Sequence, residues 1–181
     1  MTTESDDNNL TTLLRLFFTD SETVGTFEAT PAEAMPERYR CLLDHEEHMT
    51  VAVEAYHESL VDVEVLQTVV TDTHYARRIV LRRQDTREIV QWGLMRIHLP
   101  SLDQELRQEV VEERRPLGRI LVRHNFLRTI HLDTLWRITT GPELQEQFGL
   151  AGPQTTYGRT ADIHLNGQPA VEVLEILPCL E

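Results

Sequence analysis

Arg77 lies in a run of residues, 74–81, whose side chains alternate as they do in a β-strand. Side chains two positions apart share one face of a strand, so Arg77 faces the same way as Tyr75, Ile79 and Leu81. An unpaired guanidinium among such neighbours costs several kcal/mol. A carboxylate from the protein or from a ligand would remove this cost, because arginine holds carboxylates in a bidentate pair. Arg77 therefore indicates recognition of a small anion.

Two glutamates, Glu172 and Glu175, stand in residues 169–178, a segment that is otherwise typical of a buried strand. A buried carboxylate needs a partner as much as a buried guanidinium does. An inward arginine and an inward glutamate, almost a hundred residues apart in the chain, indicate a closed cavity for a small anionic ligand.

The remaining motifs favour neither a metal nor a cofactor. In His45-Glu46-Glu47-His48 the histidines are three positions apart, whereas the zincin motif needs a spacing of four. A solvated helix face is the better interpretation. The chain has no lysine, which excludes a lysine Schiff base, pyridoxal phosphate attached to lysine and a P-loop. Cys41 and Cys179 have no metal-ligand spacing.

Length and charge limit the class of protein. The 181 residues suit one domain, and the net charge of −13 makes nucleic acid an unexpected partner. The acidic N-terminus differs from a signal peptide, and no apolar run reaches the roughly 18–20 residues that span a bilayer. We expect a cytoplasmic protein without a membrane partner, either a monomer or a weak homodimer.

The pattern of elements predicts an α+β fold, an antiparallel sheet with helices to one side. Residues 1–35 are expected to be an acidic tail and a packing segment, and residues 36–181 a single domain. The expected helices are residues 36–57, with a break near His45, 102–113 and 141–148. The expected strands are residues 60–70, 75–83, 89–99, 157–165 and 170–177, the last two joined by an Asn166-Gly167 hairpin turn. Residues 120–138 fit helix or strand.

From about Leu42 to Pro178 the chain resembles the chorismate pyruvate-lyase family, in particular its mycobacterial-type 4-hydroxybenzoate synthases and their relatives. No single motif is distinctive, but their order and spacing are. The segments that carry the resemblance are His48-Met49-Thr50, Tyr75 to Leu81, Pro116-Leu117-Gly118-Arg119, Tyr157-Gly158-Arg159, Asn166-Gly167-Gln168-Pro169 and Glu175-Ile176-Leu177-Pro178.

The resemblance implies a chorismate-lyase-like fold, an antiparallel sheet of about six strands with helical flaps that cover an internal ligand cavity. It also implies a carbon–oxygen lyase that converts chorismate to 4-hydroxybenzoate and pyruvate without cofactor or metal. Such an elimination aromatises the substrate ring, so the protein has mainly to orient the substrate and stabilise developing charge.

The same resemblance assigns roles to individual residues. Arg77 would pair with a substrate carboxylate, Leu117 would offer its backbone amide at the close approach that Gly118 permits, and Met49 would line the pocket. A C-terminal glutamate would bind the ring oxygen that becomes the phenol. Strand parity favours Glu172 for this role and the local motif favours Glu175. A one-residue shift reverses the face, so both cannot serve, and we expect Glu175.

Two other functions remain open from the sequence. The same fold occurs as the effector-sensing half of transcription regulators, so a non-catalytic domain that binds a small carboxylate is the alternative to the lyase. Residues 1–40 are too short and too acidic for the winged helix that such regulators carry. The second possibility is a lyase that acts on a related aromatic or enolpyruvyl acid, because an arginine recognises a carboxylate and not a whole molecule.

Overall fold

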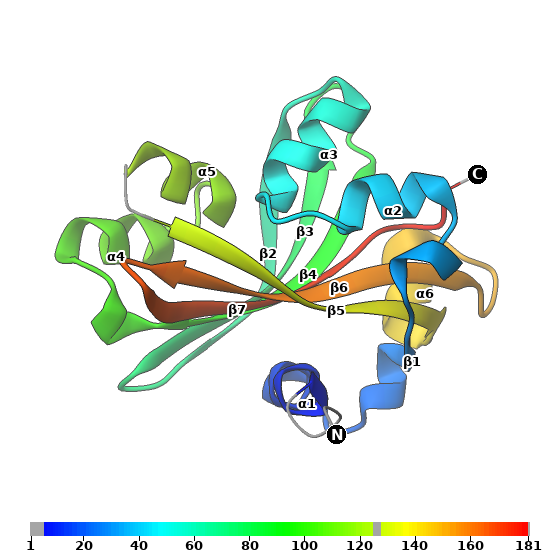
Figure 1. Cartoon of the computed structure of the whole chain (residues 1–181), viewed down its shortest axis with the longest axis horizontal. Coiled ribbons are helices and arrows are strands. Elements are labelled where there is room, and N and C mark those ends of the chain that lie inside the picture. The colour runs from blue at the N-terminus through cyan, green and yellow to red at the C-terminus, as the bar shows by residue number, and fades with distance from the viewer. Residues whose placement is uncertain (1–5, 125–127, 181) are drawn as a thin grey trace.

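The computed structural model describes residues 6–124 and 128–180 of the chain. Its centre is one antiparallel sheet of seven strands in the order β1-β5-β6-β7-β4-β3-β2 (Figure 1). The strands are β1 (Gly25–Ala29), β2 (Val61–Val70), β3 (His74–Arg83), β4 (Ile89–His98), β5 (Arg128–Thr140), β6 (Thr155–Leu165) and β7 (Gln168–Ile176). The prediction of an α+β fold with a large antiparallel sheet is confirmed, with seven strands in place of about six.

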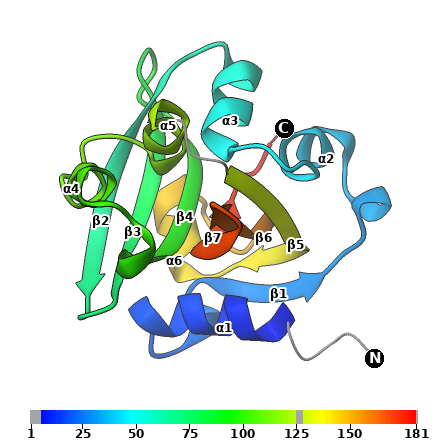
Figure 2. The same ribbon diagram turned by 60° about the vertical axis from the view of Figure 1, so that its left-hand side comes forward.

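Helices cover both faces of this sheet, so the prediction of helices on one side only is wrong (Figures 1 and 2). The helices are α1 (Asp6–Phe17), α2 (Glu37–Leu43), α3 (Met49–His57), α4 (Gln104–Val111), α5 (Leu117–Arg123) and α6 (Pro142–Phe148). Apolar residues of α2, α3, α4 and α5 pack on one face, and those of α1 and α6 pack on the other. Among the described residues, no helix is long and apolar enough to cross a membrane.

Strand β3 shows how the alternation sorts side chains between the two faces. Tyr75, Ile79 and Leu81 pack beneath α2–α5, whereas Val80 packs with α1 and α6. Arg77 has the parity of the first group and is fully buried. The Asn166-Gly167 turn is also confirmed, because both residues adopt the positive φ angles, 51° and 78°, that suit a two-residue hairpin.

The predicted boundary at residue 35 does not separate the preceding segment from the sheet. Strand β1 lies within residues 1–35, yet it pairs with β5 from Gly25 to Ala29 and forms an edge of the sheet. A glycine is required where the two strands approach, since a Cβ on Gly25 would lie 2.5 Å from the carbonyl oxygen of Thr139. This contact links segments far apart in the chain, and local pattern gives no sign of it.

Two local predictions are also resolved. The break expected near His45 is confirmed, because α2 ends at Leu43 and α3 begins at Met49. Residues 45–48 form the connection between these helices, so the interpretation as a solvated helix face is wrong. In the ambiguous stretch 120–138, α5 continues to Arg123 and β5 begins at Arg128.

Candidate functional site

A buried cavity of about 50 Å³ lies between the central strands and the helices that cover them. Strands β3, β4 and β7 supply its floor, and the first residues of α3 and α5 supply its roof. Most of the wall is apolar, and its main apolar side chains are Met49, Ile79, Leu81, Met95, Ile163 and Val173. The cavity has room for a few water molecules or a small anion, whereas sites for drug-sized ligands measure roughly 300–1,000 Å³.

Arg77 reaches this cavity as a buried cation without an acceptor. Its side chain is 0% exposed, and none of its three guanidinium nitrogens has a hydrogen-bond partner among the described residues. The Tyr75 hydroxyl lies nearby without the geometry of a hydrogen bond, and it donates instead to the carboxylate of Glu113. Burial lowers the pKa of Arg77, while Tyr75 and Glu113 act in the opposite direction. The guanidinium is therefore available to an anion that enters the cavity.

Glu175 is the glutamate that lines the cavity, as expected, but it already has a partner. Its Oε2 accepts a hydrogen bond of 2.8 Å from Nε of Arg159, the residue directly opposite on β6. The Arg159 side chain is buried and also donates to the carbonyl oxygens of His45 at 2.7 Å and Glu47 at 2.9 Å. Arg159 thus fixes the α2–α3 connection to the sheet and neutralises Glu175.

Glu172 lies on the opposite face of the sheet and outside the cavity, so its inclusion among the substrate-binding residues is corrected. It forms a bidentate pair with Arg96, which is directly opposite on β4. Glu172 and Glu175 are three positions apart on one strand, which places them on different faces. Helices α2–α5 cover the face that carries Glu175, so Glu175 and not Glu172 lines the cavity.

The other predicted residues converge on the same cavity. Met49 is the first residue of α3, and Leu117 is the first residue of α5. The amide of Leu117 has no intrahelical acceptor at that position. A Cβ on Gly118 would lie 2.9 Å from Oγ1 of Thr50, so the glycine allows α5 to pack tightly on the start of α3. The structure therefore brings together Arg77, Glu175, Met49, Leu117 and Gly118.

Two cavity residues, His48 and Gln91, are missing from the sequence prediction. Both are nearly inaccessible, at 8% and 3% exposure, and the Nε2 of His48 and the Oε1 of Gln91 have no hydrogen-bond partner among the described residues. Gln91 had a detectable signal, because it has the parity of Gly93 and Met95 within an otherwise apolar strand. His48 had none, because its burial depends on α5 covering the α2–α3 connection.

The neutral state of His48 makes folding stability depend on pH. Burial, with smaller effects from Arg128 and Arg159, lowers the pKa of His48 from 6.5 to about 4. The imidazole therefore binds a proton more strongly in the unfolded chain than in the folded one. The contribution of neutral His48 to the free energy of unfolding is full above pH 6.5 and is lost as the pH falls to 4. We expect a loss of about 3 kcal/mol between these values.

This prediction is checked by urea unfolding of the wild type and His48→Gln at pH 7 and pH 4. Subtracting the two proteins cancels the contributions of the other titrating groups. We expect the variant to lose less stability than the wild type on acidification. Equal losses in both proteins would show that His48 does not retain a depressed pKa.

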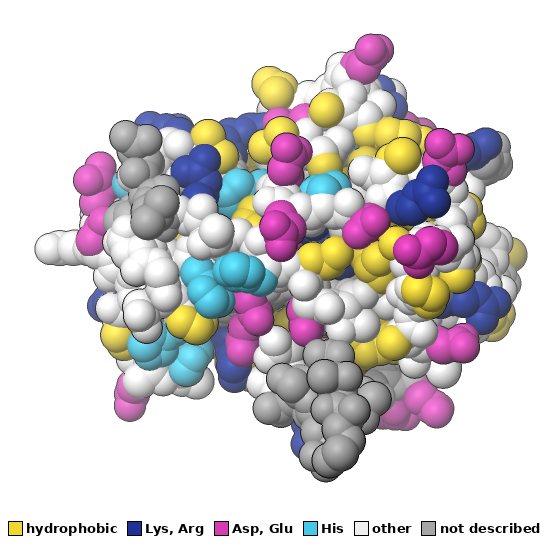
Figure 3. Space-filling view, in the orientation of Figure 1, with side chains coloured by type: hydrophobic (Ala, Val, Ile, Leu, Met, Phe, Trp, Pro, Cys, Tyr) yellow, Lys and Arg dark blue, Asp and Glu magenta, His cyan; other side chains and the backbone are white. Residues whose placement is uncertain are grey.

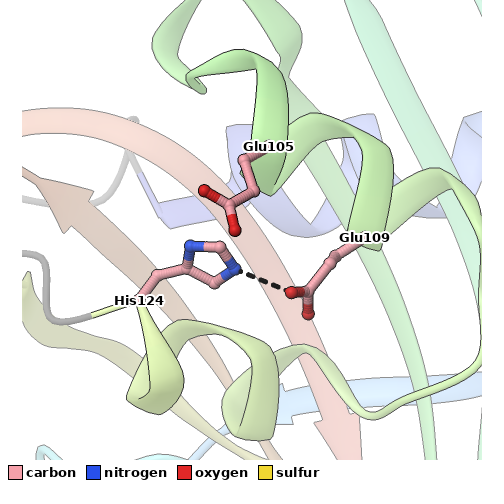
Figure 4. A group of neighbouring side chains, drawn as sticks. All are labelled: Glu105, Glu109 and His124. Carbon is pink, nitrogen blue, oxygen red and sulfur yellow. Dashed lines mark hydrogen bonds and ion pairs between the residues drawn. The ribbon is translucent and has the colours of Figure 1, made fainter.

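A separate group of possible metal ligands lies between α4 and the end of α5 (Figure 4). The ligand atoms of Glu105, Glu109 and His124 all lie within 4.8 Å of one another, and Nε2 of His124 is 3.1 Å from Oε1 of Glu109. However, guanidinium nitrogens of Arg115 and Arg123 lie 3.7 and 3.6 Å from the other oxygen of Glu109. A divalent cation would have to compete with these arginines, and we assign no metal to the group.

The surface in Figure 3 shows arginine side chains scattered among acidic ones. This view contains no continuous basic patch of the kind that follows a nucleic-acid backbone.

No protein-family model matches the sequence, and no curated protein matches it. Several solved structures do match the fold of this chain. The gene product SA0254 from Staphylococcus aureus aligns over 75% of this chain and 90% of its own, with 6% identity and a TM-score of 0.52. PhnF from Mycobacterium smegmatis aligns over 71% of this chain and 62% of its own, with 9% identity and a TM-score of 0.51. A GntR-family transcriptional regulator from Enterococcus faecalis aligns over 66% and 99%, with 10% identity and a TM-score of 0.47.

At these identities the likeness concerns the fold alone. The chain has a chorismate-lyase-like α+β fold, which it shares with SA0254 and PhnF. The predicted fold is thus confirmed at this level, without a specific enzyme family.

Proposed function

We propose that the chain is a ligand-binding domain whose cavity holds a small organic acid on Arg77. One observation carries this proposal. Eight buried side-chain atoms lack a hydrogen-bond partner among the described residues, and five of them belong to Arg77, His48 and Gln91, which line this one cavity. Unsatisfied buried polar groups are rare and costly, so their concentration in one place indicates a bound partner.

The charges around the cavity favour a monoanionic carboxylate. Arg77 supplies one positive charge, the depressed pKa of His48 keeps that residue neutral, and Arg159 neutralises Glu175. A phosphate dianion would bring a second negative charge close to Glu175 without a second cation to meet it. The apolar walls suit the hydrocarbon part of an organic acid.

The small volume of the cavity implies that the protein changes shape when a larger acid binds. An acid that carries a ring exceeds the present volume of about 50 Å³, so the roof must shift to admit it. The roof consists of the starts of α3 and α5, which meet at Gly118 and Thr50. Binding would therefore displace α5 relative to the sheet, as an effector-sensing domain requires.

Titration calorimetry tests the proposal with acetate, benzoate and inorganic phosphate as probes. We expect both carboxylates to bind at a single site, benzoate more tightly because it buries apolar surface, and phosphate to bind weakly or not at all. Benzoate binding should also change the hydrogen exchange of α5. Tight phosphate binding, or binding of neither carboxylate, would contradict the proposal.

A chorismate lyase is the second candidate function, because Arg77 and Glu175 face the same cavity together with Met49 and Leu117. We place it second because the Glu175 carboxylate is already held by Arg159 and is less free to relay a proton. Incubation with chorismate, with and without chelator, tests this function. Formation of both 4-hydroxybenzoate and pyruvate would establish the lyase. Binding of benzoate without turnover of chorismate would instead support the function of a ligand-binding domain.

A further inference from the structure

Glu113 brings a negative charge towards Arg77 without a direct hydrogen bond to it. The Oε1 atom of Glu113 accepts a hydrogen bond from the hydroxyl of Tyr75 and another, of 2.8 Å, from Oγ1 of Thr68. Tyr75 lies two positions before Arg77 on β3, and Thr68 stands directly opposite Arg77 on β2. Residues in either relation share one face of a sheet and are close neighbours. The carboxylate of Glu113 is therefore fixed near the guanidinium.

Tyr75 connects the two charges and keeps its proton. Its side chain is buried and packs with apolar residues of α4 and α5. Burial, and then the hydrogen bond to Glu113, raise the pKa of Tyr75 to about 12, so the hydroxyl stays protonated at neutral pH and donates to Glu113. The described wall of the cavity includes Arg77 but neither Tyr75 nor Glu113, so both act on a ligand through Arg77.

The backbone of Glu113 has a conformation that its side-chain contacts help to maintain. Its φ angle is 59°, in the left-handed region that residues other than glycine rarely adopt. Glu113 follows α4, which ends at Val111, and stands four positions before Leu117, which begins α5 and lines the cavity. Loss of the side-chain contacts would therefore free the α4–α5 connection, residues 112–116, next to the roof of the cavity.

We propose that Glu113 is a resident competitor of the ligand: it supplies the counter-charge of Arg77 in the ligand-free protein, and a bound acid takes over this role. This inference rests on the proposed binding function and adds the way in which binding reaches the α4–α5 connection. The two anions repel each other and draw on the same guanidinium. The acid thus weakens the contacts of Glu113, and by linkage Glu113 weakens the binding of the acid by the same factor. Glu113 is a positioning residue, because it acts through Tyr75 and Arg77.

Glu113→Gln tests the competition, because it removes the charge and keeps an oxygen that can accept from Tyr75 and Thr68. Calorimetry with benzoate should show binding about fivefold or more tighter than in the wild type. Glu112→Gln is the matched control, since it changes the net charge equally at the neighbouring exposed position, and it should leave the affinity unchanged. A purely structural role of Glu113 would leave the affinity of Glu113→Gln unchanged or lower.

Hydrogen exchange of two amides gives a second readout. The amides of Glu112 and Glu113 donate to the carbonyl oxygens of Gln108 and Val110, at 3.0 and 3.2 Å. In the wild type, benzoate should accelerate the exchange of both amides as the connection is released. Tyr75→Phe, which removes the link to Arg77, should accelerate it without benzoate and should also bind benzoate more tightly. Adding Glu113→Gln to Tyr75→Phe should bring little further gain in affinity, because both variants remove the same contact.

The outcomes separate this inference from the proposed function. If benzoate binds the wild type through Arg77 but binds Glu113→Gln no more tightly, the competitor role is wrong and the binding function stands. The same conclusion follows if Glu112→Gln gains as much affinity, or if benzoate leaves the exchange of both amides unchanged. If benzoate does not bind, or if its binding survives the loss of Arg77, the binding function and this inference both fail.

Discussion

Replacing Arg77 by Met is expected to abolish the binding of small acids and, at the same time, to stabilise the ligand-free protein. The guanidinium is fully buried and has no acceptor among the described residues, so the ligand-free fold bears the cost of its desolvation. A methionine fills similar space without charge. We expect affinity to fall by more than about a hundredfold and the free energy of unfolding to rise by about 1–4 kcal/mol.

The two effects have opposite signs, which distinguishes a binding residue from a structural one. Calorimetry with benzoate measures the first effect and urea unfolding the second. Arg78→Met is the matched control, because Arg78 is the next residue of β3, faces the other side and pairs with Glu143 at 3.1 Å. It should leave binding unchanged and should not stabilise the fold. A large loss of stability in Arg77→Met would show that Arg77 has a structural partner.

Replacing Arg159 by Met is expected to have the largest destabilising effect. The substitution leaves Glu175 without its cation and removes the donors for the carbonyl oxygens of His45 and Glu47. Breaking a buried ion pair by removing one partner costs about 3–5 kcal/mol. The α2–α3 connection should also loosen from the sheet, since it loses the two hydrogen bonds that its carbonyl oxygens accept from Arg159.

Urea unfolding measures the loss of stability, and the double variant Arg159→Met/Glu175→Met tests its cause. Removing both charges should recover part of the loss, because no unpaired carboxylate then remains. Arg137→Met is the control, since Arg137 pairs with Glu28 at 3.3 Å on the exposed edge and should cost less than about 1 kcal/mol. A similar loss in both single variants would contradict the role of Arg159.

The sequence was sufficient for those features that depend on a short stretch of chain. Alternation within residues 74–81 placed Arg77 on the covered face, and the Asn166-Gly167 pair identified its hairpin. Both depend on local geometry, namely the two-residue period of a strand and the left-handed conformations of a tight turn. The pattern of elements was likewise enough for an antiparallel α+β fold.

Tertiary structure alone decided which polar residues share the cavity. Glu172 and Glu175 have similar local surroundings, and only the strands beside β7 show that Glu175 faces inwards and meets Arg159. His48 is buried because α5, some seventy residues later in the chain, covers the α2–α3 connection. Burial and pairing are properties of contacts between distant segments, so the sequence determined that Arg77 needs a partner and the folded chain determined that the protein does not supply it.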